Sequence, residues 1–168
     1  MNTEFLNDYD EKVIALAQHL GIDLEPDFDE NDSYYVANRE DYDTDEEYKQ
    51  AQAELDEEKG KAREDAIYEV TSELDSIMNP YDNTYEYYRE EYLVLTDSEA
   101  DAEEDEALDR YLEECVLPEI PEHLQFYFDE DLWKRDARTD GRGHTLATYD
   151  GCEYEEEVNG TTYYIYRL

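Results

Sequence analysis

The residues of this chain that could do chemistry are above all carboxylates: 51 Asp and Glu stand against 13 Lys and Arg in 168 residues. The formal net charge is −38. Like charges repel one another in a compact state, so this excess does not help the chain to fold. Duplex DNA carries one negative charge per roughly 1.7 Å of its axis. The excess therefore predicts a surface that presents carboxylates where DNA presents phosphates, to a partner rich in Lys and Arg.

Many of these carboxylates are spaced so that a helix would hold them in rows. Residues three or four positions apart on a helix lie about 5–6 Å from each other. Helices are expected over 45–78 and 97–115, and an acidic loop over 25–47 holds eleven acids and one Arg. The candidate phosphate-mimicking residues, which would bind the partner, are Asp27, Asp29, Glu30, Asp32, Asp41, Asp43, Asp45, Glu46, Glu57, Glu58, Asp101, Asp105, Glu106, Asp109 and Glu113.

The charge is concentrated in the first 115 residues, which carry −31, whereas residues 116–168 carry −7. This predicts a non-catalytic inhibitor that occupies the basic cleft of a DNA-binding protein. Its own field would repel nucleic acid and anionic lipid. Two alternatives stay open: adaptation to high salt, which fits a chain with only five Lys, and an acidic chaperone of basic proteins. Folding at low salt would separate salt adaptation from partner binding.

Metal binding and catalysis have little support in the residue spacing. Asp27, Asp29 and Asn31 resemble the first ligands of an EF-hand loop, but Asp32 stands where Gly is required and Asn38 where the bidentate Glu belongs. The acids of 41–45 fail in the same way, and the three His are too far apart to form a zinc pattern. Neither a phosphate-binding loop nor a nucleophile motif is found. We expect no cofactor and no enzymatic activity.

Hydrophobic periodicity predicts the helices that must position the carboxylates. Apolar residues recur at threes and fours over 8–20, 45–78 and 97–115, and Thr96 with Glu99 forms a capping box for the last of these. Gly60 leaves open whether 45–78 is one helix or two, and Asn79-Pro80 is expected to end it. Residues 25–47 favour loop, with a short extended piece at 34–36.

The second half of the chain mixes helix and strand. Residues 84–95 fit either a helix or a buried strand, and a further helix is expected from Glu122 to about Asp136. Asn159-Gly160 predicts a hairpin turn between 154–158 and 161–166, which would set Tyr154 opposite Ile165 and Glu156 opposite Tyr163. The expected class is α+β: a mostly helical acidic body with a small C-terminal helix and β-hairpin unit. We expect one region over 1–96, acidic, helical and Tyr-rich, and a helix–helix–hairpin domain over 97–168.

The aliphatic content is low, but the chain is expected to fold. Val, Ile, Leu and Phe make up 31 of 168 residues, a share typical of disorder when net charge is high. The 18 Tyr compensate, because each ring buries area while its hydroxyl stays hydrated. Cys115 and Cys152 are expected to be reduced thiols, with a disulfide left open. Neither a signal peptide nor a membrane span is evident, which indicates a soluble cytoplasmic protein.

One stretch, 133–144, reverses the local charge with four bases and two acids. It could contact nucleic acid or phosphate. In a field this negative, the favoured interpretation is structural: Arg135 and Arg138 would pair with neighbouring carboxylates and stabilise the C-terminal unit.

The C-terminal third also resembles a known family. The similarity covers about residues 108–168 and rests on Arg110-Tyr111-Leu112-Glu113-Glu114, Pro121-Glu122-His123-Leu124-Gln125, Tyr127-Phe128-Asp129, Trp133, Arg135-Asp136, Gly141 and the Tyr164–Arg167 ending. These positions resemble the C-terminal domain of ArdA antirestriction proteins. In addition, 93–97 and 140–144 are similar to segments of uncharacterised phage-encoded proteins.

The resemblance implies an acidic DNA mimic made by a phage or mobile element, active in the cytoplasm of its bacterial host. ArdA proteins occupy the DNA-binding cleft of type I restriction–modification enzymes without catalysis. The implied partner is thus a basic DNA-binding protein of a bacterial defence system. A CRISPR effector is the alternative target, and a homodimer stays open.

Overall fold

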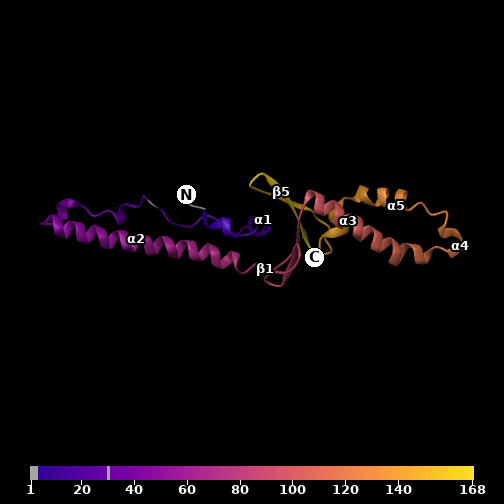
Figure 1. Ribbon diagram of the computed structural model, residues 1–168, viewed down its shortest axis with the longest axis horizontal. Coiled ribbons are helices and arrows are strands. Elements are labelled where there is room, and N and C mark those ends of the chain that lie inside the picture. The colour runs from indigo at the N-terminus through magenta and orange to yellow at the C-terminus, as the bar shows by residue number, and fades with distance from the viewer. Residues whose placement is uncertain (1–3, 30) are drawn as a thin grey trace.

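A five-stranded antiparallel sheet forms the centre of the structure, a computed structural model that describes residues 4–29 and 31–168 (Figure 1). The strand order is β1-β2-β3-β5-β4. The strands are β1 Met78–Tyr81, β2 Thr84–Tyr87, β3 Glu90–Thr96, β4 Tyr154–Val158 and β5 Thr161–Arg167. Two helical arms extend from this sheet in opposite directions, which gives the molecule an elongated shape (Figure 1).

The β4–β5 hairpin confirms the turn and the register that were expected from Asn159-Gly160. Both residues have positive φ, 52° and 83°, as the two-residue turn requires. Tyr154 pairs with Ile165, and Glu156 pairs with Tyr163. β5 also pairs with β3, so the hairpin is joined directly to the sheet.

The ambiguous segment 84–95 forms strands and not a helix: β2 and most of β3, joined by a turn at Tyr88-Arg89. The strand before this hairpin, β1, contains residues that were expected to end the long helix. α2 (Asp45–Leu74) stops at Leu74, so the prediction that Asn79-Pro80 ends it was wrong. Those two residues instead lie in β1, at the edge of the sheet. An edge strand tolerates Pro because one side of it has no strand partner that needs the missing N–H.

α2 is one continuous helix of 30 residues, about 45 Å long. Thr44 and Glu47 form a capping box at its start. Gly60 does not break it, which settles the question that the sequence left open. The irregular segment before it contains two short 3-10 turns, η2 (Ser33–Tyr35) and η3 (Arg39–Asp41). The extended piece expected at 34–36 was wrong, because the Asp32 side chain accepts from the Tyr34 N–H and starts a turn.

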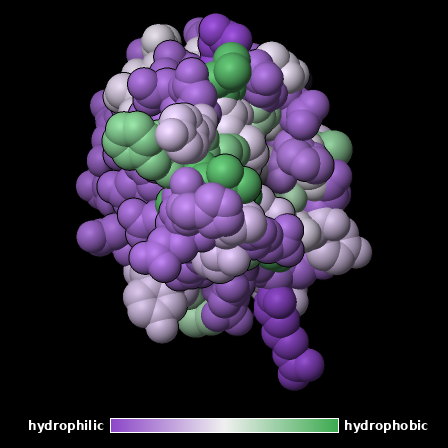
Figure 2. Space-filling view, turned by 90° about the vertical axis from the view of Figure 1, so that its right-hand side faces the viewer, coloured by the Kyte–Doolittle hydropathy of each residue, from purple (hydrophilic) through white to green (hydrophobic). Residues whose placement is uncertain are grey.

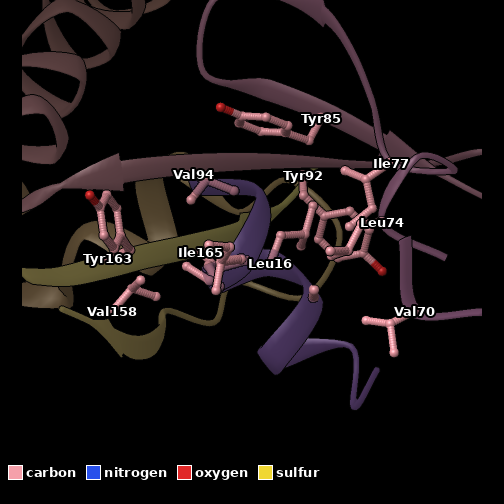
Figure 3. Close-up of a cluster of buried hydrophobic side chains, with 13 residues drawn as sticks. Leu16, Val70, Leu74, Ile77, Tyr85, Tyr92, Val94, Val158, Tyr163 and Ile165 are labelled. Atoms are coloured by element: carbon pink, nitrogen blue, oxygen red, sulfur yellow. The ribbon is translucent and has the colours of Figure 1, made fainter. Parts of the chain in front are cut away.

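The N-terminal segment completes the core. The 3-10 turn η1 (Glu4–Asp8) is followed by α1 (Glu11–His19), and the Asp10 side chain caps the start of this helix. α1 confirms the helix expected over 8–20. α1 packs on β3, β4 and β5 and meets the last turns of α2. Figure 3 shows Leu16 of α1, Val94 of β3 and Ile165 of β5 meeting at the centre of this cluster.

Tyrosine rings supply much of the same core, as the composition predicted. Tyr85, Tyr92 and Tyr163 are buried, and their hydroxyls lie toward the edge of the cluster (Figure 3). Burial, reinforced by nearby carboxylates, raises the pKa of each to about 12. These side chains therefore contribute apolar area while remaining neutral.

The second arm begins with α3 (Asp97–Tyr111), where the Glu99 carboxylate accepts from the Thr96 N–H and hydroxyl. It continues through a π-helical turn, η4 (Leu112–Val116), and a 3-10 turn, η5 (Leu117–Glu119). The helix expected over 122–136 is two short ones, α4 (Glu122–Gln125) and α5 (Glu130–Ala137). Asp129 divides them, because its side chain caps the start of α5 at the Leu132 N–H.

A last 3-10 turn, η6 (Arg138–Asp140), and α6 (Arg142–Leu146) return the chain to the sheet. A second apolar cluster forms there from Leu95, Ala100, Leu146, Ala147 and Tyr166. The architecture is α+β with a helical body, as expected. The division at residue 96 stays a prediction, although the sheet takes strands from both sides of that position. None of the helices in 4–29 and 31–168 has the length and apolar character needed to cross a bilayer.

Candidate partner-binding surface

The acidic loop runs back along α2 and forms the N-terminal arm with it, residues 25–74 (Figure 1). Gln52 of α2 holds the two together. Its amide nitrogen donates to the Tyr35 carbonyl at 3.2 Å, and its amide oxygen accepts from the Ala37 N–H at 3.0 Å. Arg39 of the loop pairs with Asp45 at 2.5 Å. The loop is therefore fixed against the helix at several points.

This arrangement places the loop carboxylates beside those of the helix. Asp27 lines one groove with Glu69 and Glu73 of α2. Further along, Asp32 caps the turn that carries Tyr34, whose hydroxyl donates to Glu58 at 3.3 Å. Asp41 and Asp43 directly precede Asp45 and Glu46 at the start of α2. Within the described residues, the candidates of 27–58 thus form two sets, one on the loop and one on the helix beside it, which we call the carboxylate rows.

All the candidates of the N-terminal arm within the described residues are exposed. Glu30 lies outside those residues. Two candidates are partly neutralised, Asp45 by Arg39 and Glu57 by Lys61 at 2.6 Å. A hydrogen bond from Lys61 and its charge hold the pKa of Glu57 below its ordinary value. Elsewhere on the described part of this arm, Asp27, Asp41, Asp43 and Glu46 have no ion-pair partner.

The linear charge density of this arm is close to that of a DNA strand. Residues 25–74 contain nineteen acids and five bases, a net charge of −14. Over the roughly 45 Å length of α2, this is about one net charge per 3 Å. A DNA strand carries one phosphate per roughly 3.4 Å. Residues 97–147 carry −12, so the charge extends over both arms of the elongated molecule.

Three candidates of α3 are engaged within the protein. Asp101 pairs with Arg142 at 3.0 Å, Asp105 pairs with Arg138, and Asp109 pairs with Lys134. These bases come from the stretch 133–144, so its structural interpretation is confirmed. Arg135, by contrast, forms a long and exposed pair with its sequence neighbour Asp136, at 3.7 Å. The remaining candidates of this arm, Glu106 of α3 and Glu113 of η4, are exposed and have no ion-pair partner among the described residues.

Arg142 is the centre of this network. Its guanidinium contacts Asp97 at 2.9 Å and Glu153 at 2.9 Å, and it lies over the Tyr164 ring at 4.2 Å. Burial by itself would lower its pKa, but the hydrogen bonds that Arg142 donates to these carboxylates outweigh burial and raise it. Arg142 therefore stays charged and ties α6 to α3 and to the segment before β4.

Glu104 is a buried carboxylate that the sequence analysis missed. The residue is 5% exposed, and its Oε2 lies 3.7 Å from the Nε of Arg138. Its Oε1 has no hydrogen-bond partner in the described chain. Burial raises the pKa of Glu104, and the charges of Arg138 and Arg142 offset only part of this effect. The sequence did contain an indication of this burial: Glu104 lies four residues from both Ala100 and Leu108, on the inner face of α3.

The far end of the C-terminal arm exposes apolar side chains, which we call the tip: Leu124, Phe126, Tyr127 and Leu132. Phe126 is 90% exposed and Tyr127 is 79% exposed. Figure 2, which faces this end of the molecule, shows hydrophobic side chains gathered near its middle among hydrophilic ones. The sequence predicted a helix over this region, from Glu122 to about Asp136, but not that two of its aromatic rings face solvent.

The described part of the chain offers little support for other chemistry. Within it, no group of three or more His, Cys, Asp or Glu is arranged to hold a metal ion. Cys115 and Cys152 are both free and exposed. The carboxylate rows are therefore the best-defined candidate site.

Comparisons with known proteins give no further guide. No protein-family model matches the chain, and neither the curated proteins nor the solved structures that were searched contain a significant match.

Proposed function

We propose that the protein is a DNA-mimic inhibitor that binds in the basic DNA-binding cleft of a bacterial defence protein and performs no catalysis. The observation that carries the proposal is the exposed carboxylates of the N-terminal arm, whose loop and helix together carry about one net negative charge per 3 Å of arm length, close to the charge density of a DNA strand. A type I restriction–modification enzyme is the first target. A Cas effector, which would make the protein an anti-CRISPR, is the second.

Two further observations support this function. The arm is stiffened by an unbroken helix and by the Gln52 contacts, so its carboxylates are held in place before binding. Such preorganisation lowers the entropic cost of association. The similarity of 108–168 to ArdA antirestriction proteins points to the same activity, in the cytoplasm of a bacterium that carries a phage or mobile element.

The basic stretch 133–144 argues against nucleic acid as the partner. Lys134, Arg138 and Arg142 all engage carboxylates of the protein itself. The net field around them is negative and repels phosphates. A basic protein is therefore the partner that the surface fits best.

The test is competition with DNA on a purified type I restriction methyltransferase. We expect tight binding that weakens as salt increases, and displacement of the inhibitor by duplex DNA. A triple variant, Asp41→Asn, Asp43→Asn and Glu46→Gln, should weaken binding and reduce its salt dependence. The matched control is Glu91→Gln, Glu155→Gln and Glu157→Gln, which removes the same charge from the exposed surface of the sheet. Binding that duplex DNA does not displace contradicts mimicry.

A further inference from the structure

We propose that the tip is a second docking site, which inserts Phe126 and Tyr127 into an apolar pocket rimmed by Lys and Arg on the same basic protein. This inference rests on the proposed function and adds a contact that DNA itself cannot make.

The tip is built to present its rings rather than to bury them. Phe126 and Tyr127 lie edge to face, with ring centroids 5.5 Å apart. Exposed aromatic rings of this kind dominate the energetics of protein interfaces, because they bury large areas with few rotatable bonds. In the described chain, the two apolar core clusters do not include either ring. The packing of these two clusters therefore does not explain why the rings are placed where they are.

The backbone that carries the rings is held in place. The Gln125 side chain donates to the carbonyls of Leu117 at 2.8 Å and Ile120 at 3.1 Å. On the other side, Asp129 caps α5. At the base of the tip, Tyr111 and Trp133 stack with an interplanar angle of 8°. The loop between α4 and α5 is therefore fixed at both ends.

The charge around the tip selects the kind of partner. Residues 116–133 contain five acids and neither Lys nor Arg. The five, all exposed, are Glu119, Glu122, Asp129, Glu130 and Asp131. A second copy of this chain would bring an identical acidic rim against the first, which is repulsive. A pocket with a basic rim is complementary, and a basic partner is what the N-terminal arm requires as well.

The tip and the N-terminal arm lie at opposite ends of the molecule (Figure 1). The two contacts therefore differ in their position and in the kind of interaction that stabilises them. Carboxylates on the arm give an electrostatic contribution that salt screens. Apolar burial at the tip is not screened by salt, so it would stabilise the complex at salt concentrations where the electrostatic contribution is weak. It would also discriminate among basic clefts, which resemble one another in charge but not in shape.

The experiment compares Kd values across salt on the purified type I restriction methyltransferase. The tip variant is Phe126→Ser with Tyr127→Ser, and the control is Tyr81→Ser, a ring on β1 that is 74% exposed. We expect the tip variant to raise Kd by about tenfold or more at every salt concentration, with an unchanged salt slope. The arm triple variant should instead change the slope, and Tyr81→Ser should do neither.

Three results would overturn the proposal in distinguishable ways. If duplex DNA displaces the wild type but the tip variant binds equally well, the tip is not a docking site and the inhibitor function stands. If the methyltransferase does not bind the wild type, the restriction enzyme is not the target and the tip loses the partner proposed for it. If sedimentation shows a wild-type dimer that the tip variant abolishes, the tip is a contact between copies.

Discussion

Lys12 and Glu99 form a 2.7 Å ion pair between α1 and the first turn of α3, although 87 positions separate them. The Lys12 side chain is only 13% exposed, and its ammonium also donates to the Asn83 side chain at 2.6 Å. Glu99 in turn accepts from Thr96, the residue that starts α3. The pair therefore joins the N-terminal helix, the β1–β2 turn and the base of the C-terminal arm.

Replacing Lys12 should loosen this junction. We expect Lys12→Met to lower the free energy of unfolding by about 1.5–3 kcal/mol, because it removes a largely buried charged donor from two acceptors. Urea denaturation at neutral pH measures the change. Lys61→Met is the matched control, since its exposed pair with Glu57 should leave the midpoint unchanged. Equal midpoints for Lys12→Met and the wild type would show that the pair does not stabilise the junction.

The same pair should make stability depend on pH in the acidic range. Burial of Glu99 by itself would raise its pKa, but the hydrogen bonds from Lys12 and Thr96 outweigh burial and hold it below the ordinary value of 4.5. A carboxyl with a lowered folded-state pKa stabilises the protein fully above its unfolded-state value. That contribution is lost as pH falls through the folded-state pKa. Lys12→Met should therefore lose less stability than the wild type below about pH 4.5.

Glu104 should change the pH dependence of stability in the opposite direction to Glu99. Its folded-state pKa is raised, so the folded protein binds the proton more tightly than the unfolded chain does, and its ionised form costs stability at neutral pH. We expect Glu104→Gln to increase the free energy of unfolding by about 1 kcal/mol near pH 7.5. The gain should shrink as pH falls through the folded-state pKa. Glu106→Gln on the exposed side of α3 controls for loss of charge, and a destabilised Glu104→Gln would show that the Arg138 pair outweighs the burial cost.

Two glycines should respond in opposite ways to an added methyl group. A Cβ at Gly60 would meet nothing within 4 Å, so Gly60→Ala should stabilise α2 by about 0.5–1 kcal/mol through helix propensity. A Cβ at Gly143 would lie 2.7 Å from the Gly151 carbonyl oxygen, so Gly143→Ala should destabilise the fold. Thermal unfolding followed by circular dichroism separates the two. Loss of helical signal in Gly60→Ala would contradict an unbroken α2.

Salt should raise stability without being required for folding. We expect the chain to be folded at about 0.05 M NaCl, and its Tm to rise as the Debye length falls from roughly 10 Å at 0.1 M to 3 Å at 1 M. The reason is that two apolar clusters stabilise the fold while the surface charges oppose it. Melting curves over this range make the measurement. A chain that folds only near molar salt would favour salt adaptation over partner binding.

Local patterns predicted the parts of the fold that depend on neighbours in sequence. The Asn159-Gly160 turn fixed the pairing of Tyr154 with Ile165, and the Thr96–Glu99 capping box marked the start of α3. Pro80 was misinterpreted because its tolerance in a strand depends on β1 being at an edge, which only the assembled sheet determines.

The candidate site was predicted in outline for a similar reason. Composition and helical spacing indicated exposed carboxylates, and those of the N-terminal arm lie together on one structure. The engagement of Asp101, Asp105 and Asp109 was not predictable, because their partners approach from α6, η6 and α5, between 25 and 41 residues further along the chain. Whose cleft the carboxylates enter stays a prediction.

The support of α2 is uneven, and this has a mechanical consequence. Its buried residues, Ala66, Val70 and Leu74, lie in the last three turns, whereas no residue of the earlier turns is buried and Gln52 joins these turns to the acidic loop. The helix is thus anchored in the core only at its C-terminal end. A rotation of about 10° at Ala66 would move Asp45, some 30 Å away, by about 5 Å, roughly the spacing of carboxylates one turn apart. Gln52 and the Arg39–Asp45 pair would carry the loop along with the helix, so the arm would tilt as one unit and its carboxylates would keep their places relative to one another.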